Sequence, residues 1–133
     1  MEYLVKTGQA PDMFGDFYKR IFKNGGICAF DIRYLDPYEA VRIIKESGGL
    51  AVLAHSGQQQ NFSLIPRLVR EGLAGLELNH PANSEKDKSI ICEYAREYGL
   101  FLTGGSDFHG DYEPDSPGIG CCLSEESGVE AIC

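Results

Sequence analysis

The amino-acid sequence predicts an α/β fold built from parallel βα units, and three observations support this class. Three apolar runs that suit strands occupy residues 50–54, 73–79 and 100–103, and each begins next to a glycine. A segment with helical spacing precedes each run. The units recur at intervals of about 25 to 30 residues, which is typical of consecutive right-handed βαβ units.

The first predicted helix covers residues 11–23. Its larger apolar side chains recur at helical spacing, and these are Phe14, Phe17, Tyr18 and Ile21. The sequence Asn24-Gly25-Gly26 follows, which is typical of a helix that ends in the left-handed conformation. Residues 27–33 favour no regular element.

The second predicted helix begins after Asp36 and runs to about Ser47. Asp36 can accept a hydrogen bond from a free backbone N–H of the first turn, and Pro37 lies where no donor is needed. Glu39, three residues after the cap, completes the signature of a helix start. The strand at 50–54 is continuously apolar, so we expect it to be buried on both faces, as in a parallel sheet.

The next unit contains a helix at 63–71, which Gly72 closes, and a strand at 73–79. Pro66 falls within the first turn of this helix, where proline is tolerated.

The last unit contains a helix that ends at Tyr98, with Asn83 or Ser84 as its cap and Gly99 as its stop. The strand at 100–103 follows this helix directly.

Composition restricts the classes of function. The chain has 133 residues, 12 basic and 20 acidic side chains, a formal net charge of -8 and 43% hydrophobic residues. These values fit one small globular domain, and no apolar run approaches the ~18 residues of a membrane span. We see no secretory signal and expect a cytoplasmic protein. The negative charge argues against duplex DNA as a partner, whereas a metal-bridged phosphate substrate stays compatible with it.

The five cysteines include no C-x-x-C pair, which argues against a zinc ribbon, and their odd number argues against a disulfide framework. We expect free, buried thiols at positions Cys28, Cys92, Cys121, Cys122 and Cys133. Because Cys121-Cys122 has no neighbouring histidine and no helix start, a nucleophilic role for the pair is not indicated.

All three histidines follow predicted strands. His55, His80 and His109 come after the strands at 50–54, 73–79 and 100–103, respectively. Functional sites of parallel α/β folds form at the carboxyl ends of strands, so this placement indicates a site. The alternative is that these are structural or exposed histidines, and for His80 that alternative is as well supported as a functional role.

Asp107 and His109 are two residues apart. If the last strand continues through them, both side chains point to the same face and can bind one ion. One carboxylate and several imidazoles suit Zn²⁺, Mn²⁺ or Fe²⁺ better than Ca²⁺. Gly105 either lets a substrate approach the main chain or forms part of a tight turn. For Glu77 we favour a structural role.

Three segments resemble the later motifs of the PHP (polymerase and histidinol phosphatase) family. They are Gly48-Gly49-Leu50-Ala51-Val52-Leu53-Ala54-His55, Gly75-Leu76-Glu77-Leu78-Asn79-His80-Pro81 and Gly104-Gly105-Ser106-Asp107-Phe108-His109-Gly110. The resemblance implies a distorted seven-stranded β/α barrel, similar to a TIM barrel, with two or three divalent ions (Mn, Zn, Fe or Mg). It implies that His55, Asp107 and His109 are metal ligands. His80 matches a position that lines the substrate site, with Gly105 beside it. Ser56 stands where the family usually has proline.

The same resemblance implies hydrolysis of phosphate esters, on nucleotides or on RNA 5′ ends. Residues 1–36 look like part of a helical insertion, and residues 37–133 look like the C-terminal βα units of the domain. The early family ligands are missing, because no histidine precedes His55. A closed barrel needs about 200 to 250 residues, so we expect the barrel to be incomplete and the chain alone to be inactive or weak.

Two other classes of function compete with this reading. The first is a non-catalytic module that pairs with a second copy or with a separate N-terminal half, because open sheets leave strand edges unpaired. A thiol redox or zinc-storage protein would need clustered cysteines.

Overall fold

The computed structural model describes residues 1–30, 32–110 and 117–133. These residues form two compact units, Met1–Tyr34 and Leu35–Cys133. The first unit contains the helices α1 (Glu2–Lys6) and α2 (Asp16–Phe22).

Helix α2 begins later than the sequence predicts. The Asp12 carboxylate accepts a hydrogen bond from the Gly15 N–H. This local turn holds the chain out of the helix until Asp16, and competition of this kind is typical of aspartate. The end of α2 also differs from the prediction, because the C-cap residue Lys23 is extended, with a φ of -129°. The left-handed residues follow that cap, at Asn24 with a φ of 52° and Gly25 with a φ of 74°.

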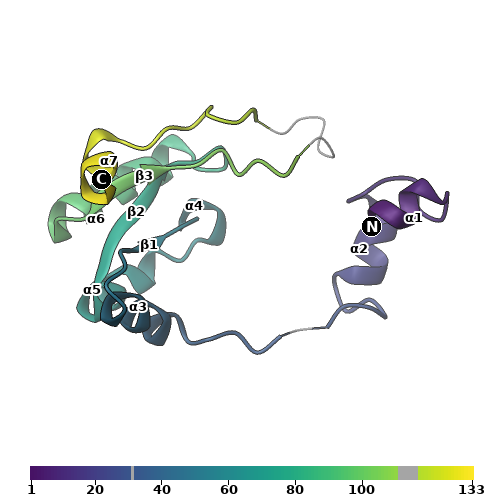
Figure 1. The fold of residues 1–133 in the computed structure, drawn as a ribbon, viewed down its shortest axis with the longest axis horizontal. Helices are drawn as coiled ribbons and strands as arrows, with labels where there is room; N and C mark the ends of the chain where they lie inside the picture. Colours follow the sequence, from purple (N-terminus) through teal and green to yellow (C-terminus); the bar gives the residue numbers. More distant parts are fainter. Residues whose placement is uncertain (31, 111–116) are drawn as a thin grey trace. The chain divides into compact units, whose positions relative to one another are not determined.

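The second unit is a mixed α/β structure with three parallel strands in the order β1-β2-β3 (Figure 1). The strands are β1 (Ala51–Leu53), β2 (Leu73–Asn79) and β3 (Phe101–Gly104). The helices are α3 (Pro37–Glu46), α4 (Ser56–Gln59), α5 (Ile65–Glu71), α6 (Glu85–Tyr98) and α7 (Glu126–Ile132), with a 3-10 turn at Phe62–Leu64. Helices α5 and α6 pack on β2, and α3 packs on α5. The predicted alternation of strands and helices is therefore confirmed.

The two best-defined helix starts are made by side chains close in sequence. The Asp36 carboxylate accepts from the N–H groups of Tyr38 and Glu39, at 2.9 and 3.2 Å, with Pro37 in the first turn of α3. At α6 the Ser84 hydroxyl accepts from the Asp87 N–H at 3.2 Å. The Asp87 carboxylate accepts in return from the Ser84 N–H at 3.0 Å, which completes a capping box.

Replacing Ser84 by alanine is expected to lower the free energy of unfolding by about 1 kcal/mol, because the N–H group at the third helical position loses its partner. Urea unfolding followed by circular dichroism measures this change. The matched control is Ser89→Ala in the same helix, at an exposed position, where the change should stay within about 0.5 kcal/mol. Equal effects of the two substitutions would show that the cap does not stabilise α6.

The hydrophobic core lies around β2. Leu76 on this strand is fully buried, and so are Ile65 on α5 and Ile91 on α6. Other buried apolar residues join them, namely Val41, Ala51, Leu68, Leu73, Leu78 and Ala95. The central strand is therefore buried on both faces.

Strand β1 does not meet the same expectation. Val52 is 36% exposed and Leu50, just before the strand, is 50% exposed. In the described part of the chain β1 pairs with β2 alone, so one edge of this strand has no neighbour. The apolar run predicted a strand correctly, but it does not determine whether other elements pack on both faces of that strand.

The outer edge of β3 is covered by a segment that the sequence did not predict as structured. The N–H groups of Leu102 and Gly104 donate to the hydroxyl groups of Ser127 and Ser124, at 3.4 and 3.1 Å. Helix α7 approaches β3 closely at Gly128, where an added Cβ would overlap the carbonyl oxygen of Leu102. At this edge, serine hydroxyl groups therefore accept the hydrogen bonds that the carbonyl groups of a fourth strand would accept.

Replacing Gly128 by alanine is expected to destabilise the packing of α7 on β3, although alanine favours helices over glycine by about 1 kcal/mol. The backbone of Leu102 cannot move aside without breaking the sheet, so the clash should exceed that gain. Hydrogen exchange at the amides of Leu102 and Gly104 reports the loss. Gly118→Ala is the control, because nothing lies near its Cβ position. Unchanged exchange in the first variant would contradict this packing.

The cysteines are free, as expected, but not buried. Cys122 is half-buried, and the others are exposed. No helix in the described residues is both long and apolar enough to cross a membrane.

Candidate metal centre

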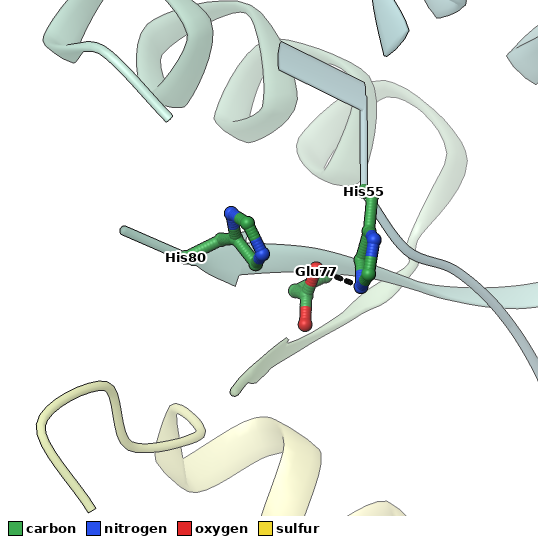
Figure 2. Close-up of side chains that lie close together, drawn as sticks. All are labelled: His55, Glu77 and His80. Atoms are coloured by element: carbon green, nitrogen blue, oxygen red, sulfur yellow. Dashed lines mark ion pairs between the residues drawn. The ribbon is translucent and has the colours of Figure 1, made fainter. Parts of the chain in front are cut away.

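Side chains from the carboxyl ends of two strands meet at one edge of the sheet. His55 lies two residues beyond β1, and His80 follows β2 directly. Glu77 projects from β2 itself, and Figure 2 shows its carboxyl group facing the His55 ring, with His80 alongside. One ligand atom from each of the three residues lies within 4.8 Å of the others, a separation that a single metal ion can bridge.

Contacts extend this group to five residues. His55 Nε2 lies 3.5 Å from Glu77 Oε2, and the rings of His55 and His80 have centroids 4.7 Å apart. His80 Nε2 lies 3.5 Å from Asp107 Oδ2. Asp107 Oδ1 in turn lies 3.8 Å from His109 Nδ1. We call these five residues the histidine–carboxylate cluster: His55, Glu77, His80, Asp107 and His109.

The loop after β3 does not continue the strand. β3 ends at Gly104, and Asp107 has a φ of 50°, in the left-handed region. The expectation that Asp107 and His109 share a face through strand alternation is therefore wrong. They are joined by the turn instead, because His109 Nδ1 donates to the Asp107 carbonyl oxygen at 2.6 Å. His55 also has a positive φ, 105°, and such strain in residues other than glycine is common at functional sites.

Glu77 is the most unusual member of the cluster. It is 9% exposed, and its Oε2 atom is buried without a hydrogen-bond partner among the described residues. Burial raises the pKa of the Glu77 carboxyl group, the positive fields of His55 and His80 oppose that rise, and Asp107 adds to it. A buried, unsatisfied carboxylate oxygen beside imidazoles fits a bound cation, because the cation would supply the missing partner.

Nδ1 accepts a hydrogen bond in His80 but donates one in His109. The Ala82 N–H donates to His80 Nδ1 at 3.1 Å, so the proton of a neutral His80 ring is on Nε2, which faces Asp107. His80 Nε2 lies 3.5 Å from the Asp107 carboxylate, is buried, and has no hydrogen-bond partner among the described residues. His109 has the reverse arrangement, since its Nδ1 donates to a carbonyl and leaves Nε2 free as a ligand. A ligating histidine typically donates its other N–H in this way.

The donor set fits a transition-metal ion. Imidazole nitrogens with one or two carboxylate oxygens suit Zn²⁺, Mn²⁺ or Fe²⁺, whereas Ca²⁺ requires a shell of oxygens. Gly105 lies against the same group, because an added Cβ would come within 2.9 Å of Glu77 Oε1. The ligand roles of His55, Asp107 and His109, and the substrate-binding roles of His80 and Gly105, stay predictions.

Sequence reasoning gave Glu77 a structural role, whereas the structure brings it to the centre of the cluster. A signal for it exists in the sequence: Glu77 is the one charged residue in the apolar strand at 73–79. An isolated acid in a buried strand requires a partner, and His80 three residues later marks the edge where that partner lies.

A cavity of about 430 Å³ adjoins the cluster at His80. Its lining includes residues from the end of β2, from α6 and from the segment before α7: Asn79, His80, Lys88, Cys121, Cys122, Leu123, Ser124 and Glu125.

Known proteins of similar sequence include a phosphodiesterase and an exoribonuclease. No family model matches the chain. The chain is 50% identical over 95 residues to a phosphoribosyl 1,2-cyclic phosphate 1,2-diphosphodiesterase of Eggerthella lenta, across 71% of this chain and 36% of that protein. It is 28% identical over 113 residues to a 5′-3′ exoribonuclease of Escherichia coli, across 80% of this chain and 38% of that protein.

A solved structure from Bifidobacterium adolescentis, assigned as a metal-dependent phosphoesterase, matches with a TM-score of 0.82 and 26% identity, over 98% of this chain and 47% of that one. The fold and these matches relate the chain to the metal-dependent phosphoesterases. Within that class, they confirm the predicted resemblance to the PHP family. The chain spans less than half the length of each of these proteins.

The raised pKa of Glu77 predicts how stability depends on pH without added metal. The folded chain holds the Glu77 proton more tightly than the unfolded chain, whose carboxyl titrates near 4.5. The contribution of Glu77 to stability is therefore present below pH 4.5 and is lost as pH rises through the folded pKa. We expect the free energy of unfolding, relative to that of Glu77→Gln, to fall with pH over this interval. Exposed Glu130→Gln is the control, and a pH-independent difference between wild type and Glu77→Gln would contradict the burial effect.

Proposed function

We propose that the chain supplies part of the active site of a metal-dependent phosphoesterase, which hydrolyses phosphate esters on a small phosphorylated molecule, a nucleotide or an RNA 5′ end. The observation that carries this proposal is the buried Glu77 carboxylate, whose Oε2 atom has no hydrogen-bond partner among the described residues, beside two histidines at the carboxyl edge of a parallel sheet. The substrate classes are suggested by the names of the relatives.

Each residue of the cluster has a task in this proposal. His55, Asp107 and His109 bind the metal, as the family resemblance implies, and Glu77 adds a further carboxylate. His80 lines the substrate site beside Asp107, whose Oδ2 lies 3.5 Å from His80 Nε2. A bound divalent cation would neutralise charge on phosphoryl oxygens and lower the pKa of bound water toward neutrality. Gly105 leaves room beside Glu77 for a substrate.

The larger architecture is also a proposal. Residues 37–133 would form the C-terminal βα units of a TIM-like barrel that is incomplete in this chain, and residues 1–36 would belong to a helical insertion. The short coverage of the relatives, 36% and 38% of their lengths, supports this. With only part of the metal shell, the chain alone would be inactive or weak.

A second candidate is a half-domain that pairs with another chain, either a second copy or a separate N-terminal half. The exposed Leu50 and Val52 beside the open edge of β1 favour it. A stable monomer in size-exclusion chromatography would count against this candidate.

The test measures Mn²⁺ binding, nucleotide binding and turnover by the purified chain. We expect Mn²⁺ to bind, AMP to bind only when Mn²⁺ is present, and phosphate release to be very slow. Asp107→Asn should lose both binding events, whereas exposed Asp16→Asn should lose neither. Binding of AMP without metal would contradict the proposed chemistry, and rapid metal-dependent turnover would contradict only the inactivity of the isolated chain.

A further inference from the structure

Two adjacent thiols line the cavity beside His80. Cys121 Sγ and Cys122 Sγ lie 3.6 Å apart, and Cys122 is half-buried while Cys121 is exposed. Lys88 lines the same cavity of about 430 Å³. The pair lies outside the histidine–carboxylate cluster, and the proposed hydrolysis does not use it.

Adjacent cysteines are poorly placed for a disulfide. Their Cα atoms are held about 3.8 Å apart by one trans peptide, below the usual range of about 4.4 to 6.8 Å for disulfides. A bond between them would be strained and readily reduced. The pair should therefore persist as two thiols, both available to one ligand.

The distance between the sulfur atoms indicates which ligand geometry they can bind. Two bonds of about 2.3 Å, a typical metal–sulfur length, span 3.6 Å when they meet at about 103°, whereas a linear centre would need about 4.6 Å. The site therefore fits a bent, pyramidal or tetrahedral centre.

Among the residues that the structure describes, the two thiols belong to no group of three possible metal ligands. Such a group occurs at His55, Glu77 and His80 instead. A centre bound here must therefore bring its own third substituent. Trivalent arsenic with one organic group meets this requirement, since two thiols complete its pyramidal shell.

We propose that Cys121 and Cys122 form a vicinal dithiol site for monosubstituted trivalent arsenicals. An arsenoxide, R–As=O, would react with both thiols to form two As–S bonds. The As=O bond breaks, and its oxygen leaves as water with the two thiol protons. No atom changes its oxidation state, so no oxidant or reductant is needed.

The surroundings of Cys122 are compatible with this reaction. Burial and the hydrogen bond from Cys121 raise the pKa of the Cys122 thiol, while Lys88 lowers it. The condensation transfers the thiol protons to the water that leaves, so a protonated Cys122 thiol is competent to react. Because His80 lines the same cavity, a bound arsenical would also obstruct the cluster, and this consequence rests on the proposed function.

The experiment uses phenylarsine oxide and a variant that keeps only this pair, with Cys28, Cys92 and Cys133, all exposed, replaced by serine. Mass spectrometry should show one phenylarsenic group per chain and the loss of two titratable thiols. The adduct should survive excess glutathione and be released by 2,3-dimercaptopropanol. Adding Cys121→Ser or Cys122→Ser should weaken binding by about 100-fold or more, because the chelate is lost.

Binding that survives either serine substitution would overturn the proposal, as would a folded pair-only variant that takes up no arsenical. Circular dichroism establishes folding in each variant. Mn²⁺ binding, measured in parallel, should be unchanged in the serine variants. A failure of the dithiol site is thereby distinguished from a failure of the proposed metal centre.

Discussion

Replacing Glu77 by glutamine is expected to weaken Mn²⁺ binding by more than about 100-fold, because even the loss of a partner outside the ligand shell costs 10- to 100-fold. Glu77 Oε2 lies 3.5 Å from His55 Nε2 and is buried without a hydrogen-bond partner among the described residues, so a bound cation would supply the missing interaction. The amide has nearly the same shape as the carboxyl group but carries no negative charge.

Thermal unfolding with and without Mn²⁺ measures this effect. At a free Mn²⁺ concentration 100 times the dissociation constant, the wild-type chain should gain about 2.7 kcal/mol. The same concentration should give Glu77→Gln almost no gain, while exposed Glu130→Gln should respond as wild type does. Since burial already disfavours the charged form of Glu77, the glutamine variant should still fold without metal. An undiminished Mn²⁺ response in Glu77→Gln would remove this residue from the site.

Replacing Leu76 by alanine is expected to lower the free energy of unfolding by about 2 to 5 kcal/mol. Leu76 is fully buried on the central strand, so the substitution leaves a cavity in the middle of the core. Domains of ordinary stability have only about 5 to 15 kcal/mol in total, so a large part would be lost.

Denaturant unfolding tests the Leu76 prediction. Leu123→Ala makes the same chemical change at a position that is 70% exposed, and its effect should stay within about 0.5 kcal/mol. If the two leucines cost the same, β2 is not the centre of the core.

The parts of the fold that could be predicted are those determined by neighbours in sequence. Asp36 and Ser84 cap their helices through residues no more than three positions away, so both helix starts were readable. The coverage of β3 could not be predicted, because Ser124 and Ser127 contact residues that lie 20 and 25 positions earlier in the sequence. The sequence around a serine in a loop does not indicate which backbone N–H group will donate to its hydroxyl.

The candidate site was predicted in part for the same reason. Strand ends are local features, so the positions of His55 and His80 followed from the apolar runs before them. The turn at Asp107 did not follow, since strand alternation fails as soon as one residue adopts a positive φ. The central place of Glu77 depends on contacts with His55, 22 positions earlier, which no local pattern contains.

The central claim is that these side chains hold a divalent ion, and anomalous diffraction from crystals grown with Mn²⁺ tests it most directly. The account predicts the strongest anomalous peak within bonding distance of a ring nitrogen of His55 and an oxygen of Glu77 or Asp107. A fully loaded crystal with its manganese elsewhere, and with these imidazole and carboxyl groups turned away from one another, would contradict it.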